Sequence, residues 1–125
     1  MVTGTHCLLY SSDPDADRTF FRDVLGFRSV DAGHGWLIFA LPPAELAVHP
    51  VEGTPGSVRT NHELLRAELY LMCDDLDAAV ARLAASQVRC SGVESAQWGR
   101  HTTVQLPSGG RIGLYQPTHP TAIGA

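Results

Sequence analysis

Two short runs of alternating side chains open the two halves of the chain. Residues 6–10 (HCLLY) and 68–72 (ELYLM) alternate between a face with His, Glu and Tyr residues and an aliphatic face, which predicts a β-strand in each run. Asp13, which Pro14 follows, and Asp75 then stand where helix N-caps are expected, ahead of apolar residues at helical spacing. Each half therefore predicts a strand followed by a helix.

Three short strands are predicted after each helix. They are expected at residues 28–31, 35–41 and 45–49 in the first half, and at residues 88–92, 101–106 and 111–116 in the second. The chain thus repeats a βαβββ module, over about residues 5–50 and about 67–118, with a Gly- and Pro-containing linker at residues 51–66. Because a half of about 60 residues buries too little apolar surface alone, we expect one α+β domain over residues 1–125 in which the modules pack together.

The two opening strands also predict which face of the sheet is covered. A helix that follows a strand must lie on one face, and the aliphatic side chains there are Cys7, Leu9, Leu69 and Leu71. The opposite face, which we expect to line a cleft, carries His6, Tyr10, Glu68 and Tyr70. Placing Asp13 on Asp75 puts His6 on Glu68, so each module has a metal-competent side chain at the same point of its first strand.

Composition excludes several classes of function. The nine basic residues are all arginines, so chemistry that needs a lysine is absent, and a net charge of −4 without a basic cluster predicts no nucleic-acid binding. The three cysteines show no CxxC spacing, which argues against a disulfide framework or a zinc finger. No apolar run reaches the roughly 20 residues of a membrane span, and no basic leader opens the chain. We expect a cytoplasmic protein with no membrane partner.

Three segments carry a resemblance to a known family. They are HCLLYSSDPDADRTFFRDVLGF, ELYLMCDDLDAAVARL and the closing LPSGGRIGLYQP. Together they resemble the vicinal oxygen chelate superfamily, which contains glyoxalase I, extradiol dioxygenases and the fosfomycin- and bleomycin-resistance proteins. The resemblance extends from His6 to about Thr121 and implies that the two modules form a curved mixed sheet around a cleft. It leaves the activity open, because the superfamily includes metal-dependent enzymes and metal-free binders.

The resemblance implies a divalent metal site built from the first and last strand of each module. The first-strand positions hold His6 and Glu68, and the last-strand position of the second module holds Gly113, which has no side chain to offer. A metal there, Zn, Mn, Ni or Fe, would act as a Lewis acid on a small-molecule substrate, and a displaced carboxylate, for which Glu68 is the catalytic candidate, would act as a base.

The fourth position is ambiguous by one residue. Counting back from Pro50 gives Leu46, whereas the polarity of the predicted strand places Glu45 and His49 on the cleft face. Polarity is the better guide, because burying Glu45 and His49 against the helices would cost several kcal/mol without partners. The predicted metal ligands are therefore His6, Glu68 and either Glu45 or His49.

Aromatic residues predict a binding surface in the same cleft. The candidates for contact with a small-molecule ligand are Tyr10, Tyr70, Trp98, Arg100, His101 and Tyr115. Two functions stay open: lyase, isomerase or oxygenase chemistry assisted by a divalent metal, and metal-free binding of a small molecule such as an antibiotic. Exposed strand edges and a composite cleft further predict a homodimer, in which the modules pair within one chain or swap between two.

Overall fold

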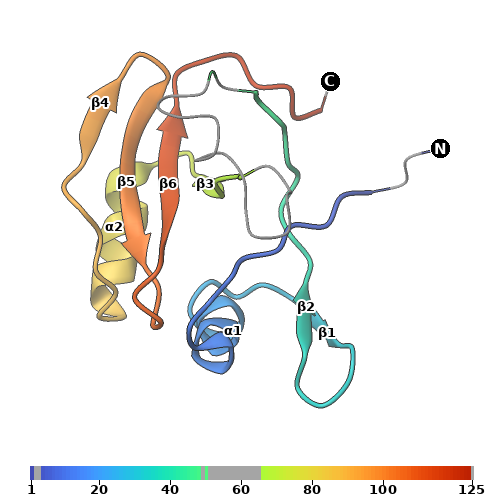
Figure 1. The fold of residues 1–125 in the computed structure, drawn as a ribbon. Coiled ribbons are helices and arrows are strands. Elements are labelled where there is room, and N and C mark those ends of the chain that lie inside the picture. The colour runs from blue at the N-terminus through green and yellow to red at the C-terminus, as the bar shows by residue number, and fades with distance from the viewer. Residues whose placement is uncertain (2–3, 49, 51–65, 125) are drawn as a thin grey trace.

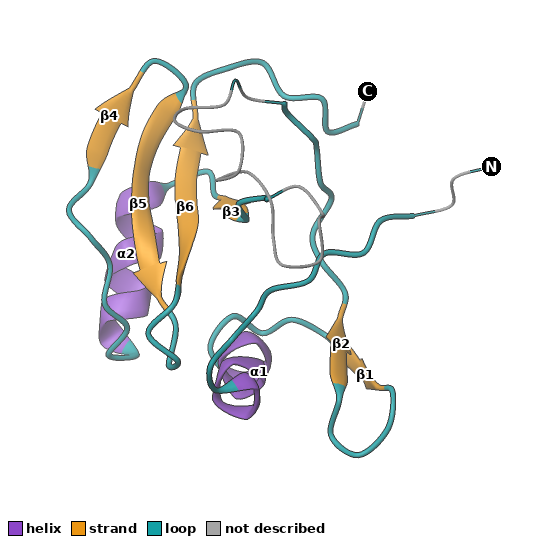
Figure 2. Ribbon diagram, in the orientation of Figure 1, coloured by secondary structure: helices purple, strands orange, loops and turns teal. Residues whose placement is uncertain are grey.

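The computed structural model describes residues 1, 4–48, 50 and 66–124 (Figure 1). It contains the helices α1 (Pro14–Asp23) and α2 (Leu76–Ala85). The strands are β1 (Ser29–Asp31), β2 (Leu37–Phe39), β3 (Tyr70–Met72), β4 (Glu94–Ala96), β5 (Gly99–Gln105) and β6 (Arg111–Pro117). The predicted α+β class is confirmed, and Figure 2 shows the strands gathered into a larger and a smaller sheet.

Both helices begin where the sequence predicts. The Asp13 carboxylate accepts a hydrogen bond from the amide of Ala16 at 3.3 Å, and the Asp75 carboxylate accepts one from the amide of Ala78 at 3.0 Å. Each bond satisfies an amide that has no partner within the first helical turn. Gly26 follows α1 at a φ of 72°, a left-handed conformation that glycine adopts without steric cost.

The second module forms a four-stranded sheet in the order β3-β6-β5-β4. Strand β3 pairs in parallel with β6, while β5 pairs antiparallel with both β6 and β4. Helix α2 covers one face, where Leu76 and Leu83 are buried in one core with Val104, Ile112 and Leu114. The predicted strand at residues 88–92 is reduced to a single bridge between Cys90 and Val104, and the edge strand β4 comes later in the chain.

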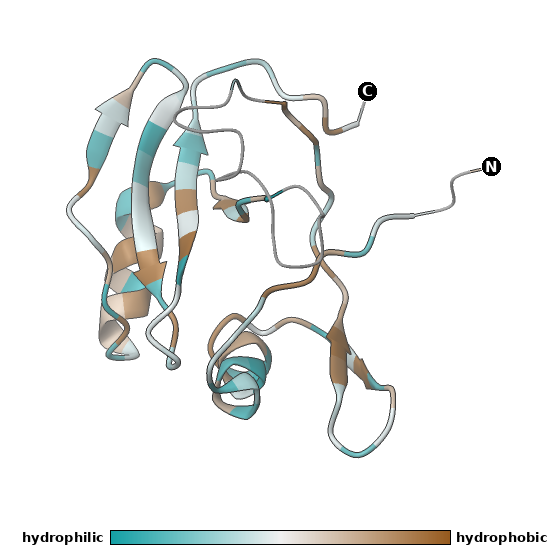
Figure 3. Cartoon of the chain, viewed as in Figure 1, coloured by the Kyte–Doolittle hydropathy of each residue, from teal (hydrophilic) through white to brown (hydrophobic). Residues whose placement is uncertain are grey.

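The first module has fewer paired strands than the sequence predicts. Among its described residues, only β1 and β2 pair, and residues 6–10 and 44–48 run as extended chain without strand assignment, contrary to the strands expected at 6–10 and 45–49. Pro42 and Pro43 follow β2, and a proline has no amide hydrogen to donate to a ladder, so the chain leaves the hairpin there. The hydrophobic stretch before α1 is visible in Figure 3. His49 and residues 51–65 of the predicted linker lie outside the described residues.

One buried side chain joins the two modules. Asp17 on α1 is buried, and its two carboxylate oxygens accept hydrogen bonds from the amide of Ser108 at 3.0 Å and from its hydroxyl at 2.7 Å. Ser108 lies in the turn between β5 and β6, so α1 is fixed against the end of the larger sheet. None of the helices in the described part of the chain is long and apolar enough to span a membrane.

Candidate functional site

Three aromatic side chains meet on the sheet face that α2 leaves open. The ring centroids of Tyr70, Trp98 and Tyr115 lie 5.4–5.9 Å apart, and each pair meets edge to face at 71–86°. His101 stacks on Trp98 at 4.5 Å and 25°. These four residues are called the aromatic cluster. Because Tyr70 is 41% exposed and Trp98 39% exposed, part of its apolar surface is accessible to a ligand.

Strand alternation explains why these residues share one face. On β5 and β6, Thr102, Val104, Ile112 and Leu114 are buried toward α2, so that His101 and Tyr115 must lie on the other side. Tyr70 joins them from β3, where its Cα pairs with that of Gly113. The structure thus brings together four of the residues predicted to contact ligand: Tyr70, Trp98, His101 and Tyr115.

Gly113 makes this packing possible. A Cβ atom at position 113 would collide with Cδ1, Cε1 and Cγ of the Tyr70 ring, which lies directly over the glycine. A carboxylate side chain could not occupy this position without moving the ring. The place where the family resemblance expects a metal-binding carboxylate is therefore covered by aromatic surface.

Carboxylates stand beside two of the tyrosines. Burial raises the pKa of Tyr70, and the charge of Glu68 and a hydrogen bond to its carboxylate raise it further. Burial also raises the pKa of Tyr115, with a smaller contribution from the charge of Glu45. Both phenols therefore stay protonated, and hence able to donate, at neutral pH.

Glu45 is held beside Tyr115 by the C-terminal residues. The amide of Ala122 donates to Glu45 Oε2 at 2.7 Å, and His119 Nε2 lies 4.0 Å from Glu45 Oε1. The hydroxyl of Tyr115 and His119 Nε2 are 3.0 Å apart, and their rings stack at 5.9 Å. Sequence reasoning assigned His119 no chemistry. Nothing local marks it, because its role comes from the return of the chain end onto the sheet.

Arg100 lies on the opposite face of the sheet from the aromatic cluster. The Arg100 guanidinium makes two hydrogen bonds to the Asp77 carboxylate, at 3.0 and 3.1 Å, on the side of the sheet that carries α2. Hydrogen bonding to Arg100, and then its charge, lowers the pKa of Asp77. Tyr10 lies in the extended chain before α1.

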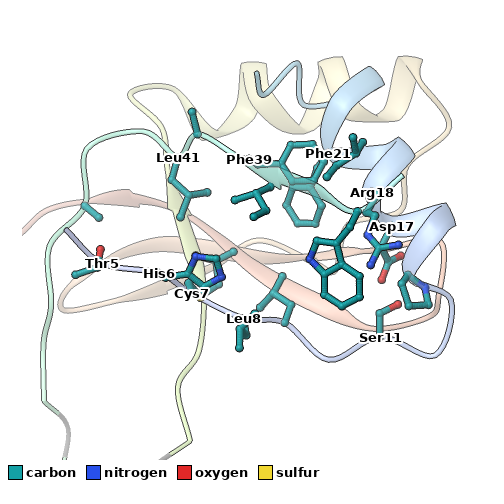
Figure 4. Close-up of a pocket in the computed structure, with 18 of the residues that line it drawn as sticks. Thr5, His6, Cys7, Leu8, Ser11, Asp17, Arg18, Phe21, Phe39 and Leu41 are labelled. Atoms are coloured by element: carbon teal, nitrogen blue, oxygen red, sulfur yellow. The ribbon is translucent and has the colours of Figure 1, made fainter. Parts of the chain in front are cut away.

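His6 lines a separate cavity in the first module. This cavity has a volume of about 560 Å³ and lies between residues 5–9, α1, β2 and residues 40–44, and Leu69 of the second module also lines it (Figure 4). Its wall is largely apolar and includes Leu8, Phe21 and Phe39. Neither Glu45 nor Glu68 contributes to this wall.

The described residues do not assemble the predicted metal site. No group of three or more His, Cys, Asp or Glu side chains that could hold a metal ion occurs among them. Glu45 is engaged by Ala122, and His49 lies outside the described residues. The divalent metal site therefore stays a prediction.

The fold of the chain is that of a known superfamily. The chain belongs to the Glyoxalase/Bleomycin resistance protein/Dioxygenase superfamily, whose family model matches residues 5–114. The predicted resemblance is confirmed. No curated protein matches the chain.

Solved structures with the same fold include two from Streptomyces sp. CB03234. The antibiotic binding protein TnmS3 is 30% identical, with a TM-score of 0.59, over 94% of this chain and 100% of its own. A glyoxalase/bleomycin resistance protein from the same organism is 32% identical, with a TM-score of 0.53, over 85% of this chain and 93% of its own. Lactoylglutathione lyase from Agrobacterium tumefaciens is 16% identical, with a TM-score of 0.60, over 91% of this chain and 92% of its own, and shares the fold.

Proposed function

We propose that this protein binds a flat, hydrophobic small molecule, of the kind found among antibiotics, on the aromatic cluster and without a metal ion. The observation that carries the proposal is the Tyr70 ring over Gly113. The ring covers, with apolar surface, the position on the open sheet face where the family resemblance expects a metal ligand. The protein would then sequester its ligand rather than transform it.

The geometry of the cluster supports a planar ligand. Tyr70 and Trp98 meet at 81°, so the cluster presents both a ring face and ring edges. A flat aromatic molecule can stack on one ring and meet another edge-on, and each such pair adds about 0.5–1.5 kcal/mol to the gain from burying apolar area. Apolar area buried from water contributes roughly 25 cal/mol per Å².

The comparisons support the same proposal. TnmS3 is described as an antibiotic binding protein and aligns with nearly the whole chain. The competing prediction is metal-assisted lyase, isomerase or oxygenase chemistry with Glu68 as base. It needs a third metal ligand in addition to His6 and Glu68. Within the described residues His6 lines the cavity of the first module and Glu45 accepts from Ala122.

The two tryptophans allow a direct test. Trp98 is in the aromatic cluster and Trp36 lines the first-module cavity, so their indole N–H signals in ¹H–¹⁵N NMR report on the two places separately. With 2-naphthol as the probe, we expect a saturable shift of the Trp98 signal, no saturable shift of Trp36, and the same result with EDTA. Trp36→Phe assigns the signals.

Two results would contradict the proposal. One is a Trp98 signal that does not respond to 2-naphthol or to larger flat aromatics. The other is stoichiometric Zn, Mn, Ni or Fe in protein purified without a histidine tag, lost together in His6→Ala and Glu68→Ala, which would favour the metal-dependent alternative.

A further inference from the structure

The C-terminal residues bring Glu45 to the edge of the aromatic cluster. Thr118 is fixed first: its amide donates to the carbonyl of Trp98 at 3.0 Å, and its hydroxyl donates to the carbonyl of Gln97 at 2.9 Å. Ala122 then donates to Glu45 Oε2 at 2.7 Å. Glu45 is thereby held next to Tyr115 although the two residues are far apart in sequence.

The hydrogen bonds of His119 define its tautomer. Nδ1 lies 2.8 Å from the carbonyl oxygen of Pro120, and a carbonyl oxygen can only accept, so Nδ1 carries the proton. In the neutral ring Nε2 is then an acceptor, and it takes the hydrogen bond of the Tyr115 hydroxyl at 3.0 Å. The Tyr115 hydroxyl therefore donates its hydrogen bond to His119, and the lone pairs of its oxygen can accept a hydrogen bond from another group.

Glu45 Oε1 lies beside the Tyr115 oxygen as a second hydrogen-bond acceptor at the edge of the aromatic cluster. Oε1 lies 4.0 Å from His119 Nε2, too far for a hydrogen bond, and no other described residue donates to it. The Glu45 side chain is only 20% exposed, so most of it is removed from water. Glu45 Oε1 and the Tyr115 oxygen are called the acceptor edge. A half-buried carboxylate oxygen without a donor strongly favours a partner that brings one.

We propose that the acceptor edge recognises a hydrogen-bond donor on the ligand. The ligand is then a flat aromatic molecule that carries a hydroxyl, amino or ammonium group at its rim, and its donor points at Glu45 Oε1 while its ring lies on the aromatic cluster. This inference rests on the proposed function and adds the chemical class of the ligand.

The tautomer can be tested without any ligand. Long-range ¹H–¹⁵N NMR of the histidine rings above neutral pH should show the His119 proton on Nδ1, and His119→Gln assigns its signals. If the proton is on Nε2 instead, the Tyr115 hydroxyl is not committed to His119, and the acceptor edge as described does not exist. That result overturns the inference and leaves the proposed function standing.

Ligand selectivity gives the second test. The probes are 2-naphthol and 2-methoxynaphthalene, which have nearly the same shape and differ in the hydroxyl proton. Wild-type protein should bind 2-naphthol about tenfold more tightly or better, as one hydrogen bond to a charged acceptor provides. In Glu45→Gln the amide oxygen can keep the bond from Ala122 while its NH₂ faces the ligand, so the preference should fall to about twofold or less.

Asp15→Asn serves as the matched control, because it neutralises an exposed carboxylate on α1 that pairs with Arg18. It should keep the preference for 2-naphthol. Equal binding of the two probes by wild-type protein, or a preference that survives in Glu45→Gln, overturns the inference alone. Absence of binding of both probes overturns the inference, and if larger flat aromatics also leave the Trp98 signal unchanged, it overturns the proposed function as well.

Discussion

At the scale of single residues, Gly113 decides what the open face of the sheet can hold. Gly113→Ala would drive a Cβ into the Tyr70 ring. We expect this variant to lose about 1–3 kcal/mol of unfolding free energy, the usual cost of overpacking, because the ring or β6 must move. It should also weaken 2-naphthol binding at Trp98. Urea unfolding and the NMR titration measure the two effects.

Gly110→Ala in the same hairpin is the control for that substitution. Its Cβ would meet only Ser108 Oγ, at an ordinary 3.5 Å. The variant should keep ligand binding and should be unchanged or up to about 1 kcal/mol more stable, because alanine restricts the unfolded chain. If both substitutions change stability and ligand binding by the same amount, the Tyr70–Gly113 contact is not the cause of the effect at Gly113.

The cysteines provide a residue-scale prediction with a pH dependence. Burial raises the pKa of Cys73 and of Cys90, whereas Cys7 is exposed. Since the thiolate is the reactive form, Cys73 and Cys90 hold less of it at pH 8 than an unperturbed thiol would. Iodoacetamide should label Cys7 first, and labelling of the other two should accelerate as pH rises toward their raised pKa. Mass spectrometry with Cys7→Ser checks this, and a fast phase that persists in Cys7→Ser contradicts it.

At the scale of elements, α1 is joined to the larger sheet through Asp17 and Ser108. Asp17→Ala leaves the amide and hydroxyl of Ser108 without their acceptor. We expect a loss of about 1–3 kcal/mol in unfolding free energy, the cost of an unsatisfied partly buried donor. Asp15→Ala on the exposed side of α1 should change stability by about 0.5 kcal/mol or less. Equal losses of unfolding free energy in the two variants, measured by denaturant unfolding, would show that the Asp17–Ser108 contact does not stabilise the packing of the modules.

The elements also show where sequence reasoning succeeds. The caps at Asp13 and Asp75 and the long hairpin of β5 and β6 were predicted because caps, periodicity and turn residues are local signals. Tyr70 and Tyr115 were both predicted to line the cleft, and their rings are in contact. The strands expected at residues 6–10 and 45–49 failed, because a strand needs a neighbouring ladder that a local pattern does not encode.

The candidate site shows the same division between local and long-range information. The sequence alone shows that position 113 lacks a metal-binding side chain. The placement of the Tyr70 ring over Gly113, however, depends on the parallel register of β3 and β6. The approach of His119 to Glu45 depends on the return of the chain end and has no sequence signature. Pairings between distant segments are therefore what the sequence left undecided.

At the scale of the whole molecule, the open first module predicts self-association. Leu46 and Val48 are 91% and 92% exposed and Leu8 is 58% exposed, in two extended segments that lack strand assignment. Exposed apolar chain of this kind favours pairing with another copy, because pairing buries its side chains and satisfies its backbone groups. We propose a homodimer in which these segments meet the partner.

Light scattering after gel filtration at micromolar concentration should give twice the chain mass for the wild-type protein. Leu46→Asp should shift the mass toward the monomer, because the buried charge would lack a partner at the interface. Val30→Asp, at a valine that is 66% exposed on β1, is the matched control and should remain dimeric. A monomer mass for the wild type over the whole range would exclude dimerisation. Dissociation in Val30→Asp but not in Leu46→Asp would instead place the interface at the β1–β2 hairpin, and the exposed segments would then need an explanation within one chain.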